Sequence, residues 1–134
     1  MGLLSFFRKT KTELSEEQVQ WNKMWALWAE GRADSPYAEL MTYQSEVNNG
    51  GHDQYFSNIE SSEKMQKQMA TLETVLSAEL QSNLRHARSA FQSLSEKEED
   101  EEAEAALERC DEIFREREDE INSILNAYAA ALDR

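Results

Sequence analysis

Residues 46–58 read Glu-Val-Asn-Asn-Gly-Gly-His-Asp-Gln-Tyr-Phe-Ser-Asn, and this stretch is the most specific local sequence in the chain. Asn and Gly tolerate a left-handed φ, so two Asn followed by two Gly can end one helix and start the next within a few residues. Asn48, Gln54 and Asn58 are expected to hydrogen-bond the backbone groups that such a joint frees. Asp53 falls in the first turn of the following helix, where the helix dipole favours a carboxylate. The stretch therefore predicts a tight joint between two helices.

The chain on both sides of this joint has the composition of helices. It contains one Pro and four Gly in 134 residues, whereas Ala, Glu, Gln, Leu and Met are abundant, and such a composition favours helix throughout. No alternating run of β-branched residues indicates a strand. We therefore expect an all-α fold, a single-domain multi-helix bundle, with residues 1–14 as an N-terminal arm and residues 15–134 as the helical domain.

Helix start and stop signals divide this domain. Ser15 and Gln18 form a capping box that opens the first helix, and Gly31 is a suitable residue to end it. Pro36 suits the first turn of the next helix. We expect helices over about residues 15–30, 36–47, 52–58, 61–76 and 78–94, followed by a last helix that runs to about residue 131.

The first helix carries three Trp residues on one stripe. Trp21, Trp25 and Trp28 are spaced by 4 and 3 residues, which places them on the same side of a helix. An aromatic binding face is one interpretation of this stripe. A core-facing stripe is the other, and we favour it because large apolar side chains at helical spacing are the usual pattern of a buried helix face.

The last helix has the clearest amphipathic pattern in the chain. From Leu107 to Ala131 apolar residues recur at alternating spacings of 3 and 4, and only Arg117 interrupts this seam. Cys110 lies in the seam, which favours a small buried side chain over a reactive thiol. Arg117 is expected to extend over the edge of the seam toward the acidic residues around it.

The charge of the chain is strongly negative and locally concentrated. There are 27 Asp and Glu against 14 Lys and Arg, a formal net charge of −13, and residues 96–120 alone hold 14 acidic and 4 basic side chains. Such a protein repels nucleic acid and anionic membrane surfaces, so neither is expected as a direct partner. The expected partners are basic: a cationic protein surface, or cations themselves.

Other functional classes find little support in the sequence. The two His residues, His52 and His86, accompany no nucleophile motif and no phosphate-binding glycine loop, so no enzyme activity and no cofactor are expected. An acid–base site of Glu46, His52 and Asp53 can be drawn, but a His beside a helix start is the simpler interpretation. One Cys allows no internal disulfide, and no calcium loop predicts a metal site. Since no apolar run could span a membrane and no signal-peptide pattern is present, we expect a cytoplasmic protein.

We call the acidic residues between positions 98 and 120 the acidic face. It comprises Glu98, Glu99, Asp100, Glu101, Glu102, Glu104, Glu108, Asp111, Glu112, Glu116, Glu118, Asp119 and Glu120. On one continuous helix over residues 96–120, about 37 Å long, ten net charges amount to about one per 3.7 Å, against about one per 1.7 Å for duplex DNA. The acidic face thus matches about one DNA strand, and a second such face, from another helix or a second subunit, would be needed to imitate a duplex.

The joint and the C-terminal part of the chain resemble a bacterial family of uncharacterised domains that includes an acidic DNA-mimic protein. The family pattern is Glu-Val-Asn-Asn-Gly-Gly, an apolar residue, a variable position, Gln, and two large apolar residues that close near an Asn. The matching residues are Glu46, Val47, Asn48, Asn49, Gly50, Gly51, Gln54, Tyr55, Phe56 and Asn58. His52 stands where the family usually has Phe or Leu. The similarity runs from about Tyr37 to Tyr128, which is most of the chain.

The resemblance implies an all-α bundle in which the matching joint residues are architectural. It also implies an acidic binding module, a DNA mimic that occupies the basic surface of a DNA-binding protein, as a monomer or homodimer. The alternative is an interaction or immunity-type protein of unknown role. Its partner would bind elsewhere, such as at the His52 joint, and its acidic run would be only a solvated face.

Overall fold

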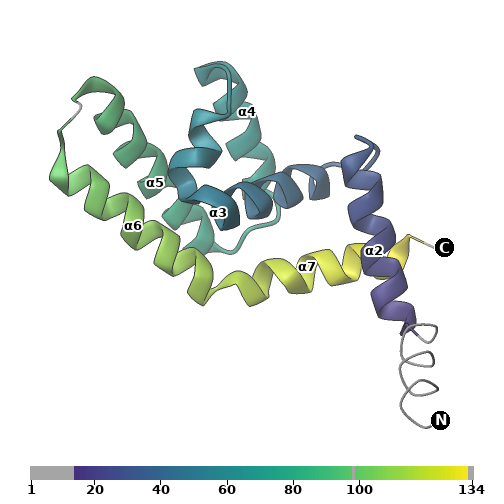
Figure 1. Cartoon of the computed structure of the whole chain (residues 1–134). Coiled ribbons are helices and arrows are strands. Elements are labelled where there is room, and N and C mark those ends of the chain that lie inside the picture. The colour runs from purple at the N-terminus through teal and green to yellow at the C-terminus, as the bar shows by residue number, and fades with distance from the viewer. Residues whose placement is uncertain (1–13, 98, 133–134) are drawn as a thin grey trace, which may run out of the picture.

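The computed structural model describes residues 14–97 and 99–132, and these residues fold into six helices with no strand among them (Figure 1). The all-α bundle expected from the composition is confirmed. The arm expected over residues 1–14 falls almost wholly outside the described residues, as does Glu98 of the acidic face. No helix of the described part is both long and apolar enough to cross a bilayer.

Short connections separate the helices. They are α2 (Glu16–Ala29), α3 (Tyr37–Ser57), α4 (Ser62–Glu73), α5 (Ala78–Glu96), α6 (Glu101–Glu116) and α7 (Glu118–Ala131). Four of them begin with a side-chain cap, in which Ser15, Ser61, Ser77 and Asp100 each accept a hydrogen bond from the backbone N–H three residues later. Such caps satisfy N–H groups that have no partner within the helix. The cap predicted at Ser15 is therefore confirmed.

The helix α3 lies at the centre of the bundle and packs against α4, α5, α6 and α7. In Figure 1, α5 and α6 run side by side as a helical hairpin, and α2 packs across α7 near the C-terminal end. Tyr128 of α7 fastens the connection between α2 and α3. Its hydroxyl accepts the Asp34 N–H at 2.8 Å, and its ring stacks on Tyr37 with centroids 4.3 Å apart.

The core is centred on aromatic side chains of α3 and α6. Tyr43, Tyr55, Phe56 and Phe114 are at most 1% exposed. Tyr43 meets Tyr55 and Phe114 edge-on, with ring centroids 5.0 and 5.4 Å apart. Edge-to-face ring pairs add to the stabilisation that burial of the rings provides. The centre of the core therefore lies beside the joint of α3.

The Trp stripe of α2 packs at the edge of this core. Met24 is fully buried, whereas Trp21, Trp25 and Trp28 are half-buried and pack against the core residues. Trp28 Nε1 also donates a hydrogen bond to Thr42 Oγ1 of α3 at 3.0 Å. The core-facing interpretation of the stripe is thus confirmed, with the indoles at the rim of the core and not at its centre.

The last helical region is broken, and the single continuous helix that we expected is wrong. The helix α6 ends at Glu116 and α7 begins at Glu118, with Arg117 between them at φ −113° and ψ 11°. The apolar seam carries a charged residue at this point, so the chain turns here and both helices keep their apolar sides on the core. As expected, Arg117 reaches an acidic neighbour, since its guanidinium contacts Glu120 at 2.8 Å. The acidic run therefore does not follow one straight axis.

The Asn-Asn-Gly-Gly joint kinks α3 as predicted. Gly50 (φ −152°, ψ 20°) and Gly51 (φ 75°, ψ −177°) leave helical geometry, and the chain then resumes as a helix to Ser57. The backbone conformation of Gly51 is one that only glycine adopts without strain. There is also no room for a side chain at this position, because a Cβ on Gly51 would collide with the carboxylate of Asp111 in α6. Glycine is required at this position for both reasons.

The amide side chains of the joint bind carboxylates and not the backbone groups that we expected them to satisfy. Gln54 Nε2 and Asn58 Nδ2 both donate to Glu46 Oε2, at 3.0 and 2.5 Å. Asn48 Nδ2 donates to Glu118 Oε2 of α7 at 2.7 Å. An ionised acceptor strengthens a hydrogen bond, so carboxylates are the better partners. Glu46 thus ties the two halves of α3 together, and Glu118 ties α3 to α7.

Replacing Gly51 with Ala should destabilise the protein by about 3 kcal/mol, because backbone strain of about 1–3 kcal/mol combines with a collision inside a packed region. Gly31→Ala is the matched control. Gly31 also has a positive φ, 72°, but nothing lies within 4 Å of an added Cβ, so this change should cost only about 1–2 kcal/mol. Urea unfolding measures both free energies. Equal losses for the two variants would show that the close approach of Asp111 contributes nothing.

Candidate functional site

His52 and Asp111 join the kinked joint of α3 to α6 through a buried hydrogen-bond network. Asp111 Oδ1 lies 2.6 Å from His52 Nδ1 and also accepts the His52 backbone N–H at 2.9 Å. The other ring nitrogen, Nε2, lies 2.7 Å from the Tyr43 hydroxyl oxygen. The His52 side chain is 0% exposed and that of Asp111 is 20% exposed. Since an ionised carboxylate only accepts, Nδ1 carries the proton that is donated to Asp111.

The surroundings of this network shift the pKa values of its acidic groups. Burial alone would raise the pKa of the Asp111 carboxyl, but hydrogen bonds from the His52 ring and backbone outweigh burial and hold this pKa below its ordinary value. Burial raises the pKa of the Tyr43 hydroxyl well above its usual range. Burial likewise raises the pKa of the Cys110 thiol to about 11, so Cys110 is the protonated, buried side chain that the seam predicted.

His52 occupies a position enclosed by aromatic rings. The rings of Tyr43, Phe56 and Phe114 have centroids 5.5, 6.4 and 6.2 Å from that of His52. A buried imidazole is tolerated there because both of its nitrogens have partners. The sequence identified the unusual residue but not its acceptor, since Asp111 lies 59 residues further along the chain.

Glu46, His52 and Asp53 are not brought together as an acid–base site. His52 has no exposed surface, and Asp53 points to solvent. The pocket that Glu46 lines is lined by neither of the other two. His86 is exposed, in agreement with its interpretation as a surface residue. Among the described residues, no group of three or more His, Cys, Asp or Glu side chains is arranged to hold a metal ion.

A second polar cluster, which sequence reasoning missed, ties α3 to α7. Gln44 is only 5% exposed and donates through Nε2 to Glu118 Oε2 at 3.0 Å and to Asn122 Oδ1 at 2.8 Å. Glu118 is the same carboxylate that accepts the Asn48 amide. These partners lie 70 or more residues away in the sequence. The spacing of residues along a single helix therefore could not predict this cluster.

The structure divides the acidic face into outward and inward side chains. The residues exposed to solvent are Glu99, Glu101, Glu102, Glu104, Glu108, Glu112, Glu116 and Asp119. In contrast, Asp100 caps α6, while Asp111 and Glu118 accept hydrogen bonds from α3. These three carboxylates serve the fold, a role that their spacing in the sequence did not reveal.

Two Arg side chains offset part of the outward charge. Arg109 contacts Glu112 at 3.1 Å, and Arg117 contacts Glu120 at 2.8 Å. Both pairs are largely exposed, so each contributes little to stability. The main consequence is electrostatic, because the acidic face presents less net negative charge than its count of acidic residues suggests.

Comparison with known protein families matches residues 36–132 to the family described as DMP19-like protein. The matched range covers most of the chain and includes the joint, the His52–Asp111 contact and the acidic face. The chain belongs to the DMP19-like protein family. Neither a curated protein nor a solved structure was found to match it.

The family match shows which part of this DMP19-like protein is shared with its relatives. The helices α3 to α7 lie within the matched residues, whereas α2 with its Trp stripe precedes them. The joint between Glu46 and Asn58 also lies inside the match. The family resemblance noted on the sequence of the joint is thus confirmed at the level of the family.

The His52–Asp111 contact should make the stability of this DMP19-like protein depend on pH in the acidic range. A carboxyl whose pKa is lowered on folding stabilises the fold above its unfolded pKa, near 3.8 for Asp111, and the contribution is lost as pH falls through the lower folded pKa. Asp111→Asn should cost about 2 kcal/mol at neutral pH, because His52 loses a charged acceptor. The difference from wild type should shrink below about pH 4. Urea unfolding at a series of pH values measures it.

Glu112→Gln is the matched control for this experiment. Glu112 is the next residue along α6, and its side chain is 58% exposed, so losing its charge should change stability by less than about 1 kcal/mol. A difference between Asp111→Asn and wild type that stays constant down to the lowest pH would contradict the role given to the Asp111 carboxylate.

Proposed function

We propose that this DMP19-like protein is an acidic protein-binding module, a DNA mimic that occupies the basic surface of a DNA-binding protein. The observation that supports this most directly is a row of exposed carboxylates along α6. The row consists of Glu101, Glu104, Glu108, Glu112 and Glu116. Spacings of three and four residues place these side chains on one side of the helix. Such a row offers a basic protein a series of negative charges, as the phosphates of a DNA strand do.

The packing of α6 supports the proposal because it holds this row on a fixed backbone. On the opposite side of the helix Ala103, Leu107, Cys110 and Phe114 are each at most 6% exposed. Asp111 fastens the middle of α6 to the joint of α3. A partner would meet a helix that is already ordered, so binding would not carry the cost of folding this segment.

The charge density of α6 can be compared with that of DNA, to judge how closely the proposed mimic would match it. This helix carries seven acidic and two basic residues over 16 positions, or about 24 Å, which is about one net charge per 5 Å against about one per 1.7 Å for duplex DNA. The sequence-based value of one charge per 3.7 Å assumed a straight helix, which the break at Arg117 rules out. The density of α6 is therefore lower than that of one DNA strand, and a second acidic surface, from another helix or from a second copy of the chain, would be needed to approach that of a duplex.

Charge reversal of the outward row tests the proposal. This protein should compete with DNA for a partner captured from host-cell extract at low salt, and its affinity for that partner should fall by on the order of tenfold or more as salt rises from about 50 to about 200 mM. Combined Glu104→Lys, Glu108→Lys, Glu112→Lys and Glu116→Lys changes should abolish the binding, because they replace attraction by repulsion. Isothermal titration calorimetry with the purified partner measures each affinity.

A second set of four reversals provides the matched control. Glu16→Lys, Glu17→Lys, Glu30→Lys and Glu63→Lys make the same change of net charge at exposed positions on α2 and α4 or at their ends, all outside the joint at residues 46–58. This variant should retain most of the affinity. Equal losses in both variants would assign binding to net charge alone. Unchanged binding in both would favour the alternative, in which the acidic run is only a solvated face and the partner binds elsewhere.

A further inference from the structure

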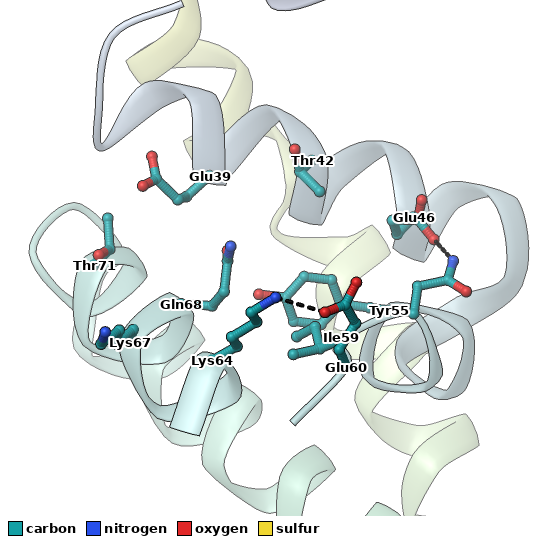
Figure 2. Close-up of a pocket in the computed structure, with 11 residues that line it drawn as sticks. Glu39, Thr42, Glu46, Tyr55, Ile59, Glu60, Lys64, Lys67, Gln68 and Thr71 are labelled. Carbon is teal, nitrogen blue, oxygen red and sulfur yellow. Dashed lines mark hydrogen bonds and ion pairs between the residues drawn. The ribbon is translucent and has the colours of Figure 1, made fainter. Parts of the chain in front are cut away.

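A pocket of about 450 Å³ lies between α3 and α4 (Figure 2). This volume lies within the range of small-molecule binding sites. Its walls come from α3, from the connection after it and from α4, and no residue of α6 or α7 lines it. The pocket is therefore separate from the acidic face.

The kink in α3 builds this pocket. Glu39, Thr42 and Glu46 line it from the first half of α3, whereas Tyr55 lines it from the short segment after Gly51. A straight helix could not present side chains 16 residues apart, as Glu39 and Tyr55 are in the sequence, to one small cavity, since they would lie about 24 Å apart along its axis. The joint thus has a second consequence besides placing His52 against α6.

Three buried polar atoms of this pocket have no hydrogen-bond partner among the described residues. They are Glu39 Oε1, the Tyr55 hydroxyl oxygen and Gln68 Oε1. Tyr55 is only 1% exposed, and Figure 2 shows its hydroxyl directed toward the α4 side of the pocket, where Gln68 lies. Buried polar atoms in folded proteins nearly always have partners. Three such atoms in one pocket therefore point to a ligand that supplies the missing hydrogen bonds.

Other polar groups around the pocket are already engaged. Glu46 accepts two amide donors of the joint, Lys64 is paired with Glu60 at 2.6 Å, and Thr42 accepts the indole N–H of α2. Glu39 uses only its second oxygen, Oε2, which accepts a serine hydroxyl at 2.9 Å. The donors to Glu46 are neutral amides that leave its charge in place, so Glu39 and Glu46 both offer negative charge to a ligand in this pocket.

We propose that the pocket binds a guanidinium group. The carboxylate of Glu39 and the amide oxygen of Gln68 are both acceptors, and the hydroxyl oxygen of Tyr55 can also accept. Guanidinium is a planar cation with N–H donors on three sides, so one group can offer donors to several acceptors of a pocket while a carboxylate balances its charge. It is also more weakly hydrated than an ammonium group, so it enters a partly buried site at lower cost.

The protonation of Tyr55 fits this ligand. Burial, together with the nearby charge of Glu39, raises the pKa of the Tyr55 hydroxyl far above its ordinary value. The hydroxyl therefore remains neutral, and the negative charge in the pocket comes from carboxylates, Glu39 and Glu46 among them. The guanidinium has two sources, a free small molecule or an arginine side chain of a partner protein. Because α6 does not line the pocket, this proposal and the acidic-face proposal can fail independently.

Titration of the full chain with agmatine, a small guanidinium compound, tests the proposal. Backbone amide NMR signals of Glu39, Tyr55 and Gln68 should shift to saturation. Tyr55→Phe and Glu39→Gln should each weaken agmatine binding by about tenfold or more, because the first removes an acceptor of a charged donor and the second removes a negative charge that attracts the cation. Glu30→Gln removes a charge from an exposed side chain outside the pocket, and it should leave the affinity within about twofold.

Two controls accompany the titration: a cation that has no N–H donor, and the stability of the protein without ligand. The bis-quaternary ion 1,4-bis(trimethylammonio)butane has the same two positive charges as agmatine but no N–H donor, so pocket shifts as large as those with agmatine would overturn the proposal, as would agmatine binding that neither pocket variant weakens. Urea unfolding without ligand should show Tyr55→Phe at least about as stable as wild type, because the hydroxyl that it removes has no partner in the fold. A large loss of stability in Tyr55→Phe would assign its hydroxyl to the fold and overturn the proposal.

A short acetylated peptide with a central arginine distinguishes the two sources. Tighter binding of the peptide than of agmatine would support the pocket as a site for a partner's arginine side chain. Tighter binding of agmatine would support it as a site for a free guanidinium compound. If neither ligand shifts the pocket signals, the pocket does not bind guanidinium and the proposal fails.

Discussion

The contact between the Asp111 carboxylate and His52 is the interaction on which the rest of the structure depends. It joins the kink of α3 to the middle of α6, two segments that are 59 residues apart in the sequence. The same carboxylate occupies the space that a side chain on Gly51 would need. The kink, the buried imidazole and the position of α6 are therefore one unit. With Asp111 turned inward, the side of α6 that remains for solvent is the row of glutamates.

The features that depend on residues within one or two helical turns could be predicted from the sequence. The cap at Ser15, the joint at Gly50 and Gly51 and the core-facing side of the last helix all belong to this class. The break at Arg117 could not, because no Gly or Pro marks it and a charged residue in an apolar seam is also compatible with a straight helix. Only the packing of both helices on one core shows that the chain turns there.

The candidate site was predictable to the same limited extent. Exposure of Glu104, Glu108 and Glu112 follows from their position opposite the apolar seam. The inward roles of Asp111 and Glu118 do not, because their partners lie on α3, far away in the sequence. The pocket between α3 and α4 was invisible for the same reason. The polar atoms without a hydrogen-bond partner come to line one pocket only because the kink brings Tyr55 to the side of the molecule where Glu39 and Gln68 lie.

The inward direction of Asp111 has a consequence for how proteins with this fold can diverge. Asp111 of α6 is bound to the joint by hydrogen bonds and leaves no room for a side chain on Gly51, whereas the outward residues of α6 contact little besides solvent and each other. The outward side of α6 can therefore change by substitution without disturbing the packing beneath it. A shared joint sequence identifies the scaffold of two members of the family and says little about the charge that each presents on this side of α6.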